Sequence, residues 1–226
     1  MSAQLGPKKP RILVAGYSSW AMAAKNPAAA VVDNLKSRDY VEFELVALEV
    51  PVSTSKLSQF VLEALDKYKP DAWIGIGVAV SSHVVRSEMV GLNWRHFHVP
   101  DIDGINAQLE NIVEDGPVAY NSDLPHTQIV SQIKKAGIPA ELSFYAGTHL
   151  CNQMTYTLRH LISERALPIL SGFIHIPQSP ENVANGSKEG RNSSSMSLEM
   201  STKALEITIG CVAQSVRERS TKQCGG

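Results

Sequence analysis

Short apolar runs alternate with amphipathic segments along most of this chain, and this alternation is the feature that most restricts its fold. Arg11 to Gly16 is a short apolar run that ends in glycine, typical of a buried strand. Ser53 to Lys69 carries apolar residues at helical spacing, as expected for a helix with one buried face. The same patterns predict further strands over residues 42–50, 71–80, 140–145 and 168–176, and further helices over residues 26–37, 126–136, 150–163 and 197–218.

Successive strands joined by helices favour parallel pairing, because a parallel strand needs a crossover connection. We therefore expect an α/β fold: an open, largely parallel twisted sheet with helices on both faces and its site at the carboxyl ends of the strands. Residues 83–97 fit either one long bent strand or a hairpin, and residues 98–115 and 178–195 are expected to be loops. The length of 226 residues predicts a single domain, 1–226, with flexible tails at 1–10 and 219–226.

The composition excludes several classes of partner. The formal net charge of −1 gives no electrostatic basis for binding nucleic acid or an anionic membrane. No apolar stretch approaches the roughly 18 residues that a membrane span needs. The chain has three cysteines, an odd and sparse count that argues against a disulfide framework and favours a reducing compartment. We expect a cytoplasmic protein.

Cys151 is the first candidate for chemistry. It follows the small residues Ala146 to Thr148 and stands at the start of the helix expected from residue 150. The free N–H groups and the positive end of a helix favour an anion there, and a thiol attacks as its thiolate. Taken alone, a cysteine in an apolar context is more often a packing residue, so both interpretations stay open.

His175 and Glu88 are candidates to assist the thiol. His175 follows Cys151 by 24 positions, inside the apolar strand Phe173 to Pro177, where a hydrogen-bonded core histidine is the alternative. Glu88 is a carboxylate within an apolar stretch, able to orient an imidazole or to pair locally with Arg86. The other histidines lack metal-ligand spacing with a carboxylate or thiolate, so we expect no metal site.

Three motifs in order give the chain a resemblance to the type I pyroglutamyl peptidases (pyrrolidone-carboxylate peptidases). Ala146 to Asn152 is similar to the family's A-G-T-x-x-C-N, Gly172 to Pro177 to its G-F-I-H-x-P, and Glu88 to Asn93 to its E-x-V-x-x-N. The separations, 63 from Glu88 to Cys151 and 24 from Cys151 to His175, also fit the family. The resemblance covers residues 11–213.

The resemblance implies a cysteine peptidase that removes an N-terminal pyroglutamyl (5-oxoprolyl) residue from peptides. Cys151 would be the nucleophile, His175 the base and Glu88 the residue that orients His175. Backbone N–H groups at the start of the helix would stabilise the oxyanion. No metal or organic cofactor is implied, and family members include monomers and tetramers, which leaves a homo-oligomer open.

Three segments depart from the family around the expected substrate pocket. The first loop retains the two aromatic residues Tyr17 and Trp20 where the family has G-F-x-P-F-G-G. Gly77 to Ser82 replaces G-Q-A-G-G-R, so that Val78 would hold the substrate lactam through main-chain atoms. His98 replaces the arginine of R-I-P-D, and a histidine carries full charge only below about pH 6.5.

These departures keep two alternatives open. One is a catalytically weak homologue that binds modified peptide N-termini, and the other is a hydrolase of a different small acyl amide. The substitution at His98 predicts turnover that is slower or more acid-favoured than in typical members.

Overall fold

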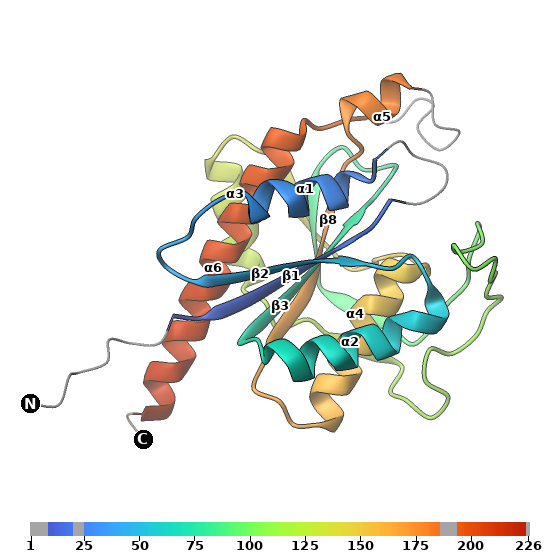
Figure 1. Cartoon of the computed structure of the whole chain (residues 1–226), viewed down its shortest axis with the longest axis horizontal. Helices are drawn as coiled ribbons and strands as arrows, with labels where there is room; N and C mark the ends of the chain where they lie inside the picture. Colours follow the sequence, from blue (N-terminus) through green and yellow to red (C-terminus); the bar gives the residue numbers. More distant parts are fainter. Residues whose placement is uncertain (1–8, 20–24, 186–193, 225–226) are drawn as a thin grey trace, which may run out of the picture.

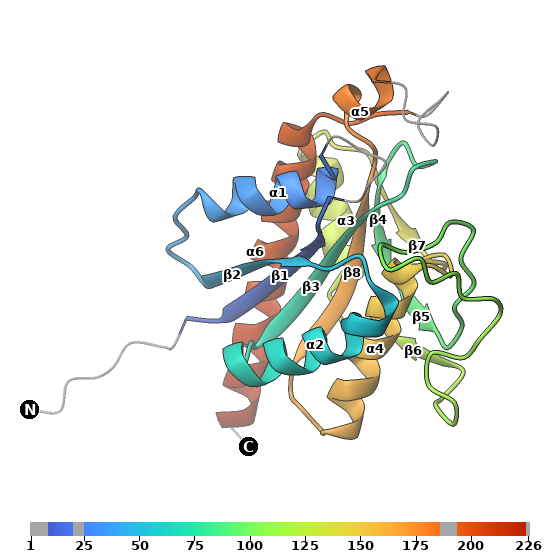
Figure 2. The same ribbon diagram turned by 45° about the vertical axis from the view of Figure 1, so that its right-hand side comes forward.

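The computed structural model describes residues 9–19, 25–185 and 194–224 of the 226-residue chain. A six-stranded sheet forms the centre of the molecule, in the order β2-β1-β3-β8-β4-β7, and a second sheet pairs β5 with β6 (Figures 1 and 2). The strands are β1 (Arg11–Tyr17), β2 (Glu44–Val50), β3 (Ala72–Val78), β4 (Val85–Glu88), β5 (Val90–Leu92), β6 (Ala119–Asn121), β7 (Ala140–Ser143) and β8 (Leu170–Ile176). The helices are α1 (Pro27–Lys36), α2 (Thr54–Tyr68), α3 (His126–Lys135), α4 (Leu150–Glu164), α5 (Pro180–Ala184) and α6 (Leu198–Cys224).

Helices cover both faces of the large sheet, as the alternation of segments predicted. Helices α1, α3 and α6 pack on one face and α2 and α4 on the other (Figures 1 and 2). Successive side chains of β1 point to opposite faces of the sheet. Ile12 packs in the core under α1, α3 and α6, and Leu13 packs in the core under α2 and α4. Because the central strands are buried on both faces, they read as continuous apolar runs in the sequence. The expected α/β fold is confirmed.

The direction of β4 and β7 is the feature of this sheet that matters most for the site. Strands β2, β1, β3 and β8 are parallel, whereas β4 runs antiparallel to β8 and is itself parallel to β7. The reversed strand therefore enters the sheet beside β8 and carries its last residue, Glu88, to a position in register with Phe173.

The segment 83–97 is neither one bent strand nor a hairpin. It holds two short strands in different sheets, because β4 pairs with β7 and β8 whereas β5 pairs with β6. The short strand β6 and the helix α5 lie where only loop was expected, and α6 continues to Cys224, beyond the predicted end at 218. Runs of three to five residues are too short to show a hydrophobic period, so these pairings depend on tertiary contacts.

Candidate functional site

Cys151 lies in the first turn of α4, at the edge of the sheet where β1, β3 and β8 end. The turn before it contains Gly147 at φ 81°, a left-handed conformation that L side chains rarely adopt. His149 is the N-cap, and Cys151 is half-buried. The N–H groups of the first helical turn have no intrahelical partner and are available to an anion beside the thiol.

The floor under the thiol is made by Gly77 of β3. Gly77 is in register with His175 of β8. A Cβ atom added at Gly77 would lie 2.7 Å from Sγ of Cys151 and 2.8 Å from Cζ of Phe173. Glycine is therefore needed here to leave room for the sulfur rather than for a special backbone conformation.

Glu88 and His175 form a buried ion pair across β4 and β8. Nδ1–H of His175 donates to Oε1 of Glu88 at 2.8 Å, and the side chain of Glu88 is fully buried. With Nδ1 occupied, Nε2 is the ring nitrogen left for the hydrogen bond with Cys151. The imidazole thus lies between the thiol and the carboxylate, the arrangement of a nucleophile, a base and an orienting acid.

The electrostatics of His175 depend on its two neighbours, Cys151 and Glu88. Burial disfavours the charged form of His175, but the negative charge of Cys151 and the hydrogen bonds with Cys151 and Glu88 outweigh it and raise the pKa to about 10. Burial likewise disfavours the carboxylate, yet His175 holds the pKa of Glu88 below its usual value. Both shifts favour a protonated imidazole beside an ionised Glu88 near neutral pH.

The local alternative for Glu88 is wrong in this structure. Arg86 points to the neighbouring strand, where its Nε lies 2.9 Å from Oε1 of Glu141. Glu88 faces the interior and pairs with His175 instead. The core alternative for His175 is partly right, because the ring is hydrogen-bonded and only 6 % exposed.

The residues expected to contact substrate differ in burial and in their surroundings. The Tyr17 ring is buried, and its hydroxyl donates to the carbonyl of Leu150 at 2.5 Å, so it supports the start of α4. Burial, and then the charge of Cys151, raise the pKa of Tyr17 well above its usual value. Val78 is half-buried at the end of β3, whereas His98 is exposed and packs edge-on against His96 at 5.2 Å between ring centroids. Trp20 lies outside the described residues.

Two asparagines of the motifs brace the site, a role that the sequence did not reveal. Oδ1 of Asn152 accepts from the N–H of Leu92 at 2.8 Å, and its Nδ2 donates to the carbonyls of Leu92 and Trp94 at 2.9 and 2.8 Å. Asn93 accepts from the N–H groups of Ile112 and Val113, each at 2.9 Å. Their positions beside Glu88 and Cys151 in the motifs were the available signal, but their partners are remote in sequence.

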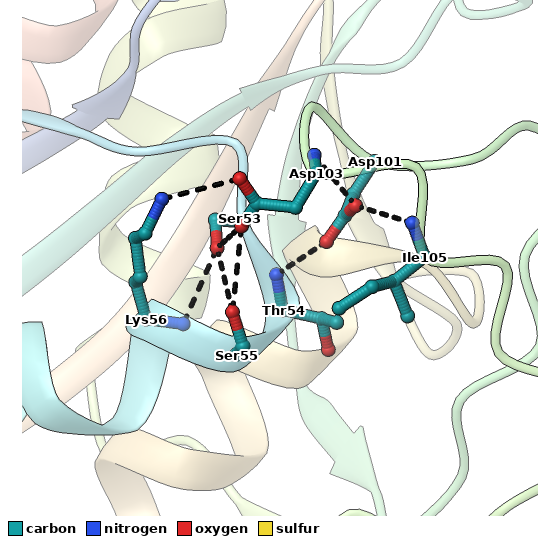
Figure 3. A network of polar contacts seen from close by, with 7 residues as sticks. All are labelled: Ser53, Thr54, Ser55, Lys56, Asp101, Asp103 and Ile105. Carbon is teal, nitrogen blue, oxygen red and sulfur yellow. Dashed lines mark hydrogen bonds and ion pairs between the residues drawn. The ribbon is translucent and has the colours of Figure 1, made fainter.

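The loop after β5 is tied to α2 by hydrogen bonds of two carboxylates, of which that of Asp101 is buried (Figure 3). Oδ2 of Asp101 accepts from the N–H of Thr54 at 2.7 Å, and its Oδ1 accepts from the N–H groups of Asp103 and Ile105. The same loop reaches the turn before Cys151, because the N–H of His96 donates to the carbonyl of Thr148 at 3.0 Å. This network holds the turn of the nucleophile against the rest of the domain.

A second buried histidine is expected to make the folded protein less stable at acid pH. His126, 5 % exposed, shares a hydrogen bond of 2.7 Å with the Ser87 hydroxyl, and burial lowers its pKa to about 4. The unfolded chain binds this proton near pH 6.5. The neutral folded form is therefore destabilised as the pH falls from about 6.5 towards 4, by about 2 kcal/mol between pH 7 and pH 5.

His126→Gln checks this expectation through urea unfolding at pH 7 and pH 5. The variant should lose less stability than the wild type over that interval, whereas His83→Gln, at an exposed position, should behave as the wild type. An equal pH dependence in His126→Gln and wild type would contradict the assignment.

Among the described residues, no cluster of three or more His, Cys, Asp or Glu side chains is placed to hold a metal ion. No helix within the described ranges is long and apolar enough to cross a membrane.

Comparisons with known proteins agree with the geometry. The sequence profile of the family described as pyroglutamyl peptidase matches residues 10–215. A pyrrolidone-carboxylate peptidase of Vibrio vulnificus is 34% identical over 216 residues, covering 96% of this chain and 98% of the relative. That of Coprothermobacter proteolyticus is 33% identical over 208 residues, covering 92% and 99%.

Solved structures extend this agreement to the fold. The pyrrolidone carboxyl peptidase of Thermococcus litoralis superposes with a TM-score of 0.86 at 28% identity, covering 93% of this chain and 96% of that one. A mutant pyrrolidone carboxyl peptidase of Pyrococcus furiosus gives a TM-score of 0.86 at 29% identity, covering 91% and 99%. With its three motifs, its fold and the match over most of its length, this chain belongs to the pyroglutamyl peptidase family.

Proposed function

We propose that this protein is a cysteine peptidase that removes an N-terminal pyroglutamyl residue from peptides. The observation that carries the proposal is the position of His175, which bonds Glu88 through Nδ1 and Cys151 on its other side. Membership of the pyroglutamyl peptidase family supplies the substrate class. In this proposal Cys151 is the nucleophile, His175 the acid and base, and Glu88 the residue that orients and charges His175.

The acylation step follows from these roles. The thiolate of Cys151 attacks the carbonyl carbon of the pyroglutamyl residue and forms a C–S bond, and the carbonyl oxygen becomes an oxyanion. N–H groups of the first turn of α4 donate to this oxyanion. The imidazolium of His175 then gives its Nε2 proton to the leaving amine, the C–N bond breaks, and a thioester remains on Cys151.

Deacylation reverses the part played by His175. The neutral imidazole takes a proton from a water molecule, whose oxygen attacks the thioester carbon. The C–S bond breaks, pyroglutamic acid leaves, and the thiolate–imidazolium pair is restored. Glu88 remains ionised throughout, because its function is to stabilise the imidazolium.

Substrate contacts are part of the same proposal. The main chain of Val78 would hold the lactam, and Trp20 would provide the aromatic surface. The buried Tyr17 would act from below, by supporting the start of α4 through its bond to Leu150. His98 would assist the oxyanion when protonated, which predicts an acid-favoured pH profile that His98→Arg removes. An unchanged profile in His98→Arg would count against this role.

Release of coumarin from a pyroglutamyl-coumarin amide tests the function. We expect hydrolysis of this amide, little hydrolysis of the prolyl and glutamyl amides, and complete loss after treatment with iodoacetamide. Tight binding of pyroglutamyl peptides without turnover would favour a binding homologue. Faster hydrolysis of a different small acyl amide would favour the other alternative.

The floor beneath the thiol predicts a second effect on turnover. In Gly77→Ala the new Cβ would meet Sγ of Cys151 at 2.7 Å, and the sulfur would have to move relative to His175. Displacements of about 1 Å can cost about 100-fold in rate, so we expect a loss of that order in kcat/KM. Gly210→Ala is a matched control, because a Cβ at Gly210 meets nothing within 4 Å. Full activity of Gly77→Ala would contradict the placement of the thiol.

We also propose that residues 1–226 form one peptidase domain that acts in the cytoplasm without a cofactor. The reducing environment of the cytoplasm suits a catalytic thiolate. A homo-oligomer belongs to this proposal and is tested by light scattering during size-exclusion chromatography, where a single monomer mass would exclude it.

A further inference from the structure

The second carboxylate oxygen of Glu88 is the least satisfied polar atom of the catalytic group. Oε1 accepts from Nδ1 of His175, whereas Oε2 is buried and has no hydrogen-bond partner within the described part of the chain. Leaving a charged oxygen unpaired in the interior is costly, so a donor within reach of Oε2 would have a large effect on the carboxylate.

Ser143 is placed to be that donor. It is the last residue of β7 and is in register with Glu88 in the parallel pair of β4 and β7. Side chains of register partners lie on the same face of a sheet, so the hydroxyl and the carboxylate are neighbours. The backbone is fixed at this point, because the N–H of Met89 donates to the carbonyl of Ser143 at 2.7 Å.

Among the described residues, the hydroxyl of Ser143 makes only weak competing hydrogen bonds. Its contacts with the N–H and the carbonyl of Tyr145 are both at 3.5 Å, the outer limit of a hydrogen bond. A rotation about χ1 can therefore redirect the hydroxyl towards Oε2 without moving the strand. The nearness of Ser143 is also one of the causes that lower the pKa of the Glu88 carboxyl, after burial, which raises it, and His175.

None of the other groups around Glu88 donates to Oε2 within the described part of the chain. His175 of β8 is engaged with Oε1, and Arg86 of the same strand bonds Glu141. His126 of α3 bonds Ser87 through Nδ1, and its Nε2 makes no hydrogen bond to Glu88 within the described residues.

We propose that Ser143 is a positioning residue whose hydroxyl donates to Oε2 of Glu88 and holds Oε1 against Nδ1 of His175. Its importance for turnover rests on the proposed peptidase function, but its effect on the thiolate–imidazolium pair is independent of any substrate. Without this donor the carboxylate is free to rotate and is more easily protonated. The imidazolium is then less stabilised, and the pair forms at higher pH.

Ser143→Ala and Ser143→Thr provide the first test. The rate at which iodoacetamide alkylates Cys151 is measured from pH 4 to 9, with labelling located by mass spectrometry. In Ser143→Ala we expect the acid limb of this profile to move up by about 0.5 to 1 pH unit, and kcat to fall about threefold to tenfold with KM within about twofold. Ser143→Thr retains the hydroxyl and should restore the wild-type limb.

A double-mutant cycle separates positioning from a merely structural role. In the Glu88→Gln background the carboxylate is absent, so Ser143→Ala should have no further effect on the alkylation profile or on kcat. The same loss in both backgrounds, or an unshifted acid limb in Ser143→Ala, would overturn the proposal. If Ser143→Ala does not fold, Ser143→Gly is measured in its place, with thermal unfolding as the check.

The two readouts distinguish this proposal from the proposed function. A wild type that fails to hydrolyse the pyroglutamyl amide, together with a shifted alkylation limb in Ser143→Ala, would contradict the peptidase assignment and support Ser143. A wild type that hydrolyses the amide, together with an unshifted limb, would support the peptidase and contradict the role of Ser143.

Discussion

Cys151→Ala is expected to lower kcat/KM for the pyroglutamyl-coumarin amide by at least about 10⁴-fold, because it removes the sulfur that we propose forms the acyl-enzyme bond. The start of α4 should remain intact, since Tyr17 and Asn152 hold it through their own hydrogen bonds. Circular dichroism and thermal unfolding should therefore match the wild type while hydrolysis is lost.

Cys211→Ala is the matched control for the loss of a thiol. Cys211 is buried in the cluster beneath α6, and burial raises the pKa of its thiol. We expect a loss of stability of about 1 kcal/mol with kcat/KM close to that of the wild type. Hydrolysis that survives in Cys151→Ala, or that disappears in Cys211→Ala, would contradict the assigned nucleophile.

Glu88→Gln is expected to lower kcat/KM by about 10³-fold. Glutamine retains the size of the side chain but carries no charge, so the imidazolium of His175 loses its buried counter-ion. Its amide can also present an N–H₂ group to Nδ1 and stabilise the wrong tautomer. The acid limb of Cys151 alkylation should move to higher pH, because the pair with His175 forms less readily.

Glu141→Gln is the matched control on the adjacent strand. Glu141 is exposed and pairs with Arg86, so its charge is screened by water and should change kcat/KM by less than about twofold. An effect in Glu88→Gln no larger than in Glu141→Gln would contradict the role of the buried carboxylate.

Most long elements of the fold could be predicted from their periodicity. The buried runs that became β1, β3 and β8 and the amphipathic segment that became α2 were found close to their observed bounds. The short strands β4, β5 and β6 could not be separated in this way, because three or four residues do not reveal a period. Their pairing depends on contacts between residues far apart in the chain.

The candidate site likewise contains residues that the sequence could identify and residues that only the structure reveals. Motif spacing selected Cys151, His175 and Glu88, since the residue types and their order were visible in the chain. Motif spacing could not identify Gly77 or Ser143. Gly77 matters because the thiol of Cys151 lies above it, and Ser143 lies beside Glu88 only once β4 and β7 are paired.

The sequence by itself determined the class of fold and the chemical identity of a thiol, an imidazole and a carboxylate, because periodicity and residue type are properties of the chain. The tertiary structure decided their electrostatics. The reversal of β4 against β8 takes Glu88 out of water and onto Nδ1 of His175, where a carboxylate can charge the imidazole that faces Cys151. Burial and distance set that interaction, and both arise only when strands remote in sequence come into register.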